Sequence, residues 1–147
     1  MSTSKLSTLA GIAEERADRS AVDLEQRRAE LTRTRVRYEQ LASYARDYRD
    51  NAANEGLPAA LQSRQRFQMS IDQHVSDLAE QMRAKREAVE RMTESVREDR
   101  ASASALQALQ ARGAEQDRRR AERRTENAFD AAFASRHAAS RRDGDER

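Results

Sequence analysis

Small and apolar residues recur every three to four positions along most of this chain, and this repeat sharply limits the folds open to it. Such spacing places the recurring residues on one stripe of an α-helix, which is typical of a coiled coil. We call this stripe the seam. In the first stretch, the seam consists of Ala10, Ala17, Leu24, Leu31, Tyr38 and Ala45, alternating with Leu6, Ala13, Ser20, Arg27, Thr34, Leu41 and Tyr48. In the second stretch, it consists of Val75, Met82, Val89, Val96 and Ala103, alternating with Ile71, Leu78, Lys85, Met92, Asp99 and Leu106.

The composition agrees with long helices rather than with a globular core. Charged residues and hydrophobic residues each make up 37% of the chain, while aromatic residues make up 4%. A globular core needs bulky apolar side chains to offset the ordering of the chain, at about 1.5 kcal/mol per residue. Long helices satisfy their backbone hydrogen bonds internally and need only a narrow apolar stripe. The predicted fold class is therefore all-α.

One short segment, NAANEGLP, interrupts the repeat. Gly56 can adopt the backbone conformation that ends a helix, and Pro58 suits the first turn of the next one. Because two helices joined by a short turn fold back on each other, we predict an antiparallel two-helix coiled-coil hairpin. Its parts, within a single domain over residues 1–147, are a first helix at about 4–50, a turn at about 51–57, a second helix at about 58–140 and a flexible tail at about 141–147.

The position of the turn also predicts which residues face each other. A turn centred between Asn54 and Glu55 brings together residues whose numbers add up to about 109. On this register Leu24 faces Lys85, and the first helix has no residues left to pair beyond about residue 105 of the second. The second helix therefore overhangs from about Gln107, as a stretch that is either disordered in part or ordered by another molecule.

No group of residues predicts catalysis or cofactor binding. The chain has no cysteine, its two histidines, His74 and His137, lie far apart, and no glycine-rich loop is present. Zinc sites and phosphate-binding loops need such residues at close spacing. We therefore expect no enzyme activity, no metal site and no cofactor. The N-terminal segment lacks the pattern of a signal peptide, and no apolar stretch approaches the ~20 residues of a membrane span, so we expect a cytosolic protein.

The arginine-rich segment Arg118–Arg124 predicts a solvated helix face or a contact with an acidic protein. Between Arg112 and Glu126, four acidic residues offset four of the six arginines. No aromatic residue lies among them to stack on bases. We expect no nucleic-acid binding, and a basic coiled coil that binds nucleic acid is the alternative.

Aromatic residues gather near the turn and again in the C-terminal stretch. We expect Tyr44, Tyr48 and Phe67 to cluster, partly exposed, near the tip of the hairpin. Exposed aromatic residues in polar surroundings are typical anchors of protein–protein contacts, although these three could instead only tighten the tip. Phe129 and Phe133 share one helix face in the overhang, which predicts a short partner-binding stripe.

The segment QLASYARDYRDNAANEG, followed by ALQSRQRFQMSIDQ, resembles the flagellar FliJ family, the small coiled-coil component of the flagellar type III export apparatus. The resemblance consists of a Leu, two Tyr four residues apart, a short polar turn with Gly, and a Phe opening the second helix. It implies a helical hairpin that enters the hexameric export ATPase ring, contacts the cytoplasmic linker of the export-gate membrane protein, and escorts export chaperones.

The resemblance also implies which residues bind these partners. On the gate-binding patch of the family, the matching residues are Leu41, Tyr44, Tyr48, Phe67 and Ile71. Arg37, His74 and Leu78 depart from the family's pattern in the same patch. For the ATPase ring, position alone indicates Leu6, Leu9, Ile12, Leu106, Leu109, Phe129 and Phe133.

The expected protein is a cytoplasmic monomer that reaches the cytoplasmic face of the inner membrane only through its partners. Two other functions stay open. One is the equivalent stalk of a virulence-type III secretion system, and the other is a generic dimerising coiled-coil scaffold.

Overall fold

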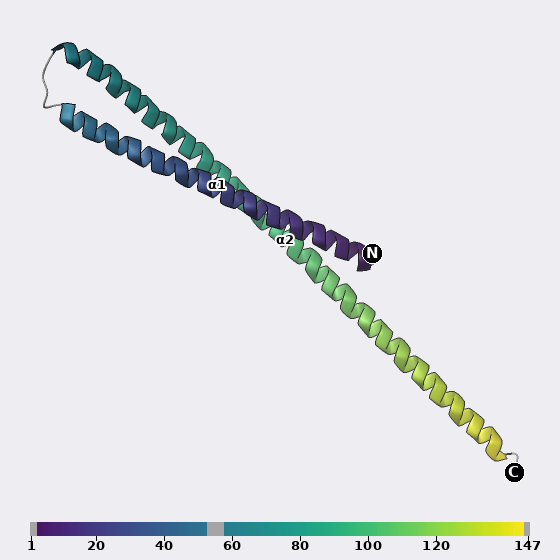
Figure 1. Cartoon of the computed structure of the whole chain (residues 1–147). Coiled ribbons are helices and arrows are strands. Elements are labelled where there is room, and N and C mark those ends of the chain that lie inside the picture. Colours follow the sequence, from purple (N-terminus) through teal and green to yellow (C-terminus); the bar gives the residue numbers. More distant parts are fainter. Residues whose placement is uncertain (1–2, 53–57, 146–147) are drawn as a thin grey trace. The chain divides into compact units, whose positions relative to one another are not determined.

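Two helices make up this computed structural model, which describes residues 3–52 and 58–145 (Figure 1). Helix α1 spans Thr3–Ala52, and helix α2 spans Pro58–Asp145. The two helices pack against each other, which confirms the predicted all-α helical hairpin.

The helix bounds differ from the predicted ones at two places. Asn51 and Ala52 belong to α1 rather than to the turn, and the rest of the predicted turn, residues 53–57, lies outside the described residues. Helix α2 continues beyond its predicted end near residue 140 to Asp145. Of the predicted flexible tail, only residues 146–147 lie outside the described residues.

Local sequence explains why both helices are long. Pro58, the single proline of the chain, is the first residue of α2, where its missing N–H leaves no helical hydrogen bond unmade. Oppositely charged residues one turn apart support the exposed faces. Arg35 Nε lies 2.9 Å from Glu39 Oε1, and Arg119 Nε lies 2.8 Å from Glu115 Oε1. Each such pair contributes about 0.3–0.5 kcal/mol.

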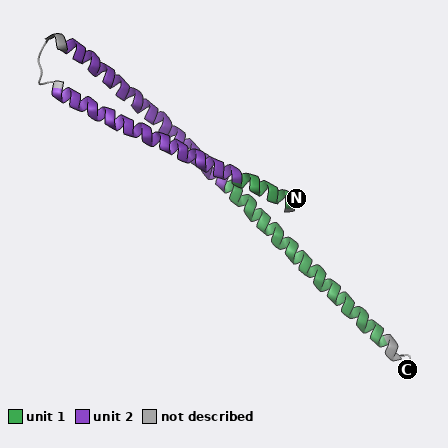
Figure 2. Cartoon of the chain, viewed as in Figure 1, with its two compact units in different colours: residues 1–14, 101–147 green, residues 15–100 purple. Residues whose placement is uncertain are grey.

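The chain divides into two compact units, shown in Figure 2. Residues 15–100 form one unit, which we call the hairpin unit because it contains parts of both helices on either side of residues 53–57. Residues 1–14 and 101–147 form the other, which we call the terminal unit. The two predicted partner-binding surfaces fall into different units.

Burial follows the predicted seam. The residues that are buried among those described are Ala10, Ala17, Leu24, Thr34, Ala45, Ile71, Val96 and Ala103. All eight lie on the seam, so the helix stripe was predicted correctly. Half of them are alanine, and small seam residues leave room for large ones opposite and keep the helices close.

Hydrogen bonds across the hairpin unit correct the predicted register. Ser20 Oγ donates to Asp99 Oδ2 at 2.5 Å, and Lys85 Nζ donates to Thr34 Oγ1 at 2.9 Å. The residue numbers of both pairs add up to 119 rather than 109, so the predicted pairing of Leu24 with Lys85 is wrong. A shift of ten residues corresponds to about 15 Å along a helix.

The physical reason is that polar seam residues need partners. A buried polar group without a hydrogen bond costs about 1–3 kcal/mol. The predicted register placed Asp99 opposite Ala10 and Lys85 opposite Leu24, and neither apolar residue can accept or donate a hydrogen bond. The observed register gives both polar residues a hydroxyl partner. Hydrogen-bond partners across the seam, rather than the midpoint of the turn, therefore indicate the register.

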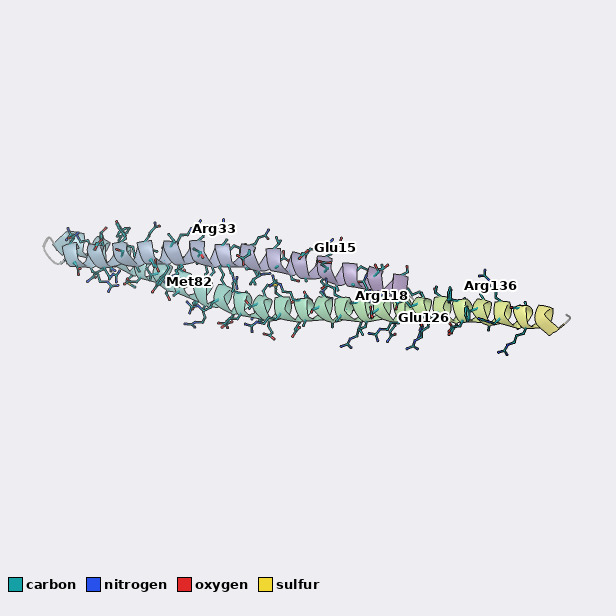
Figure 3. The ribbon with its side chains drawn as sticks, turned by 90° about the horizontal axis from the view of Figure 1, so that it is seen from below. Glu15, Arg33, Met82, Arg118, Glu126 and Arg136 are labelled. Carbon is teal, nitrogen blue, oxygen red and sulfur yellow. The ribbon has the colours of Figure 1, made fainter. Side chains whose placement is uncertain are left out.

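The corrected register also moves the start of the overhang. A pairing sum of 119 matches the first residue of α1, Thr3, with residue 116, so the predicted start near Gln107 is too early. Every residue of 116–141 is exposed. This stretch is helical throughout, and side chains such as Glu126 and Arg136 point outward from α2 in Figure 3.

Candidate protein-binding surfaces

Three aromatic residues form a cluster in the hairpin unit near the end of α1. The ring centroids of Tyr48 and Phe67 lie 4.9 Å apart in an edge-to-face arrangement, and those of Tyr44 and Tyr48 lie 6.4 Å apart. Tyr44 is 51% exposed and Phe67 is 45% exposed, while Tyr48 is half-buried between them. We call these residues the tip cluster. Their predicted clustering is confirmed, and their role in binding stays a prediction.

The other two predicted gate-binding residues differ in accessibility. Ile71 is only 5% exposed and belongs to the seam, so it supports the surface from below. Leu41 is half-buried and lines an open groove together with Arg37, Tyr44 and Leu78. We call this the apolar groove. Leu78 also departs from the family pattern, yet it lies in the same groove as Leu41.

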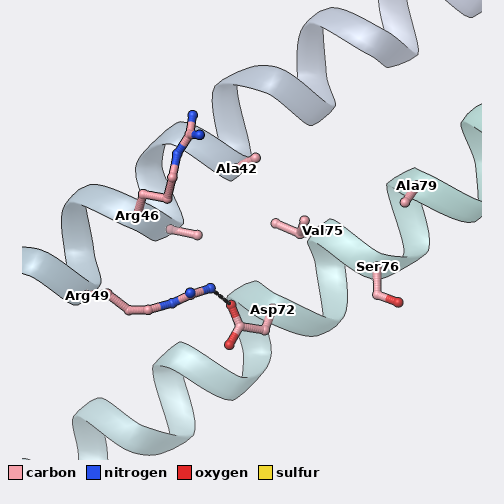
Figure 4. Close-up of a pocket in the computed structure, with 8 residues that line it drawn as sticks. Ala42, Arg46, Arg49, Asp72, Val75, Ser76 and Ala79 are labelled. Carbon is pink, nitrogen blue, oxygen red and sulfur yellow. Dashed lines mark hydrogen bonds and ion pairs between the residues drawn. The ribbon is translucent and has the colours of Figure 1, made fainter.

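A polar contact that the sequence did not predict joins the two helices near the tip cluster (Figure 4). Arg49 Nη2 donates to Asp72 Oδ1 at 3.0 Å, and Gln68 Nε2 donates to the same oxygen at 3.0 Å. The side-chain oxygen of Gln68 is buried and has no hydrogen-bond partner among the described residues. Arg49 and Asp72 can be matched only once the register is known, and no local pattern marks them.

Polar side chains also occupy the seam farther from the tip. Asp99 Oδ2 accepts a hydrogen bond from Ser20 Oγ, and Asp99 Oδ1 lies 3.2 Å from Arg16 Nε. Thr34, which is 4% exposed, donates to the backbone oxygen of Glu30 at 3.0 Å and accepts from Lys85. These contacts fix the two helices against each other in one register.

A second open groove lies beside the Thr34–Lys85 contact. Its lining consists of Glu30, Arg33, Thr34, Arg37 and Lys85. Three of these side chains carry a positive charge and one carries a negative charge. We call this the basic groove. Arg37 lines both the basic groove and the apolar groove, so the two grooves adjoin.

The residues predicted for the ATPase ring all lie in the terminal unit. Leu6 and Leu106 are half-buried, so they are less accessible than the rest. The exposed members, with their exposed fractions, are Leu9 41%, Ile12 58%, Leu109 49%, Phe129 73% and Phe133 58%. The ring of Phe133 lies 4.6 Å from that of His137, edge to face, a contact that sequence reasoning missed although the two are one turn apart.

Comparison with known protein families shows to which family the chain belongs. A family model described as the flagellar FliJ protein matches residues 1–143. The chain belongs to this family. Comparison with curated proteins and with solved structures found no match.

Membership in the FliJ family identifies the chain as a component of the flagellar export apparatus. The resemblance predicted from the tyrosine-containing segment is confirmed, and it extends over nearly the whole chain. The virulence-type stalk and the generic scaffold are thereby disfavoured. The FliJ family is a non-catalytic part of that apparatus.

Two further observations bear on the chemistry of this FliJ-family chain. Across residues 3–52 and 58–145, no three His, Cys, Asp or Glu residues gather as metal ligands would. In the same part of the chain, neither helix has a stretch apolar enough to cross a membrane.

Proposed function

We propose that this chain links the export ATPase ring to the cytoplasmic linker of the export-gate membrane protein and performs no chemistry itself. The tip cluster is the observation that carries the proposal. In this account the chain works in the cytoplasm as a monomer, and it reaches the cytoplasmic face of the inner membrane through the gate.

The tip cluster has the properties of a binding hot spot. Tyr44 and Phe67 expose about half of their surface, and Tyr48 holds the two rings in place by contact with both sides. Rings that are already ordered lose little conformational freedom when a partner covers them. Aromatic anchors beside a groove account for a large share of binding energy in many interfaces. Leu41 and Leu78 supply such a groove.

The terminal unit supplies the surface for the ATPase ring. Residues 116–141 form a helix whose side chains are all exposed, including Phe129 and Phe133. An unpartnered helix of this kind is only marginally stable in water. The surrounding ATPase hexamer would cover the side chains of Phe129 and Phe133 and stabilise the helix. Released export chaperones are a third class of partner, for which no particular residues are proposed.

Removal of two tyrosine side chains tests the gate contact. The variant Tyr44→Ala with Tyr48→Ala should lose about 2–4 kcal/mol of binding free energy for the cytoplasmic part of the gate protein, as expected for a hot spot. Its helical content by far-UV circular dichroism should stay unchanged, since neither residue is fully buried. Titration calorimetry of the full-length chain measures the affinity.

Val22→Ala is the matched control, because Val22 is 58% exposed on α1 of the same unit and lies far along the helix from the tyrosines. It should bind as the unmodified chain does. A loss of helical content that parallels the loss of binding in the tyrosine variant would mean that the tip cluster is only structural.

A further inference from the structure

We propose that the basic groove binds a carboxylate of the same gate partner, so that the docking surface combines aromatic anchors with a charge-specific site. This inference rests on the proposed function and adds the chemistry of the partner. The partner segment carries an Asp or Glu side chain that reaches Arg37 and Lys85.

Lys85 is the central residue of the proposed carboxylate site. It is half-buried on the seam, and its ammonium group donates to the hydroxyl of Thr34 at 2.9 Å. Thr34 is itself fixed, since it is buried and donates to the backbone oxygen of Glu30. An ammonium group has three hydrogens to donate. Within the described part of the chain, Lys85 forms no ion pair, and the three cations of the groove outnumber its single carboxylate, Glu30.

The two arginines of the basic groove increase this excess of positive charge. Arg33 and Arg37 are one turn apart on α1, where like charges repel. Arg33 Nε donates only a long hydrogen bond, 3.4 Å, to the backbone oxygen of Ala29. Arg37 forms no ion pair with any described residue. A carboxylate placed between these cations would relieve the repulsion.

Neighbouring arginines on the same helix behave differently. Arg28 pairs with Glu25 at 2.8 Å, and Arg35 pairs with Glu39 at 2.9 Å. These two cations are paired with carboxylates one turn away, whereas no ion pair joins Arg33, Arg37 or Lys85 to a described residue, although Glu30 lines the same groove. A solvated arginine face would not include a lysine held at fixed position by a buried hydroxyl.

The apolar groove determines which partner supplies the carboxylate. Arg37 belongs to both grooves, so a segment seated against Leu41 and Leu78 continues into the basic groove. Thr34 lies seven residues from Leu41, and Lys85 lies seven residues from Leu78. Seven residues are about 10 Å on a helix. A partner helix would meet both grooves with an apolar residue and an acidic residue two turns apart.

Salt-dependent binding of two variants tests the inference. Lys85→Met removes the charge but keeps a long apolar side chain on the seam and leaves the Thr34–Glu30 bond intact. We expect its affinity for the cytoplasmic part of the gate protein to fall about tenfold at low ionic strength. At high ionic strength the loss should shrink to less than about threefold, because salt screens the pairing in the unmodified chain. Arg37→Gln should behave in the same way.

Arg86→Gln is the matched control. Arg86 is exposed on α2 next to Lys85 in sequence but does not line the basic groove. Its variant should bind as tightly as the unmodified chain at both salt concentrations. The measurements use the full-length chain, and far-UV circular dichroism verifies equal helical content in all variants.

The outcomes separate the two proposals. If the unmodified chain does not bind the gate, both proposals are overturned. If it binds and the double tyrosine variant does not, while Lys85→Met and Arg37→Gln bind normally at both salt concentrations, only the carboxylate site is overturned. An equal loss at low and high salt would assign Lys85 a role in packing and would also overturn the carboxylate site.

Discussion

The two parts of α2 are both helical, but they have different surroundings. Between residues 71 and 103, α2 contributes Ile71, Val96 and Ala103 to the buried seam. From residue 116 to residue 141 it contributes no buried residue, and its largest apolar side chains, Phe129 and Phe133, are 73% and 58% exposed. Both parts have a helix-favouring sequence, but only the part between residues 71 and 103 has buried side chains.

The two parts of α2 therefore depend on different interactions for their helical stability. Exposed ion pairs such as Arg118 with Glu115, 2.7 Å apart, support a helix but contribute less than about 1 kcal/mol each. Most helical stability in proteins comes from packing of an apolar face. The hairpin unit obtains that packing within its own chain. Residues 116–141 have no buried side chain that would supply such packing.

The largest expected effect is a charge placed on the seam. Ala45 is 2% exposed, so Ala45→Glu should lower the free energy of unfolding by about 3–5 kcal/mol, since an unpaired charge would be buried. The matched change in the exposed stretch, Ala131→Glu, should stay within about 0.5 kcal/mol. Urea unfolding followed by far-UV circular dichroism measures both. Equal effects would contradict the contrast between the buried seam of the hairpin unit and the exposed stretch of α2.

The seam could be predicted from the sequence because heptad spacing is a local property. All eight buried residues, from Ala10 to Ala103, were on it. The register could not be predicted in this way. Heptad spacing shows which residues lie on the stripe, but it does not show which of them pair across the two helices. Only partners across the seam, such as Ser20 with Asp99, distinguish them.

The candidate site shows the same division between local and long-range information. Tyr44 and Tyr48 are one turn apart and Phe67 follows the turn closely, so their cluster could be predicted. The basic groove could not be predicted, because Arg33 and its neighbours look like a solvated face until Lys85 is placed opposite them. Correct pairing of the two helices is needed to find it.

A smaller effect is expected from the polar contacts that set the register. Asp99→Ala removes the partner of Ser20 and Arg16, and it should destabilise the hairpin unit by about 1–2 kcal/mol. The control is Glu94→Ala, which breaks an exposed pair with Arg97 and should cost less than about 0.5 kcal/mol. Thermal unfolding compares the two. A cost for Glu94→Ala as large as that for Asp99→Ala would show that the seam contact has no special weight.

The smallest effect on hairpin stability is expected from shortening α2. Residues 120–141 are all exposed, so removal of Arg120–Arg147 should change the free energy of unfolding of the hairpin by less than about 0.5 kcal/mol. Affinity for the export ATPase should fall at least tenfold, because Phe129 and Phe133 are lost. Pulldown and titration with the ATPase measure this. Unchanged ATPase affinity would remove residues 116–141 from that interface.

Burial in the hairpin unit is confined to a single layer of side chains between two helices. Every seam residue is therefore separated from water by no more than its immediate neighbours, and opening one layer exposes little of the next. Arg27 is exposed although it occupies a seam position, whereas Ala45 is only 2% exposed. Burial in the hairpin unit is thus uneven from one seam position to the next, and local opening is expected to follow that pattern.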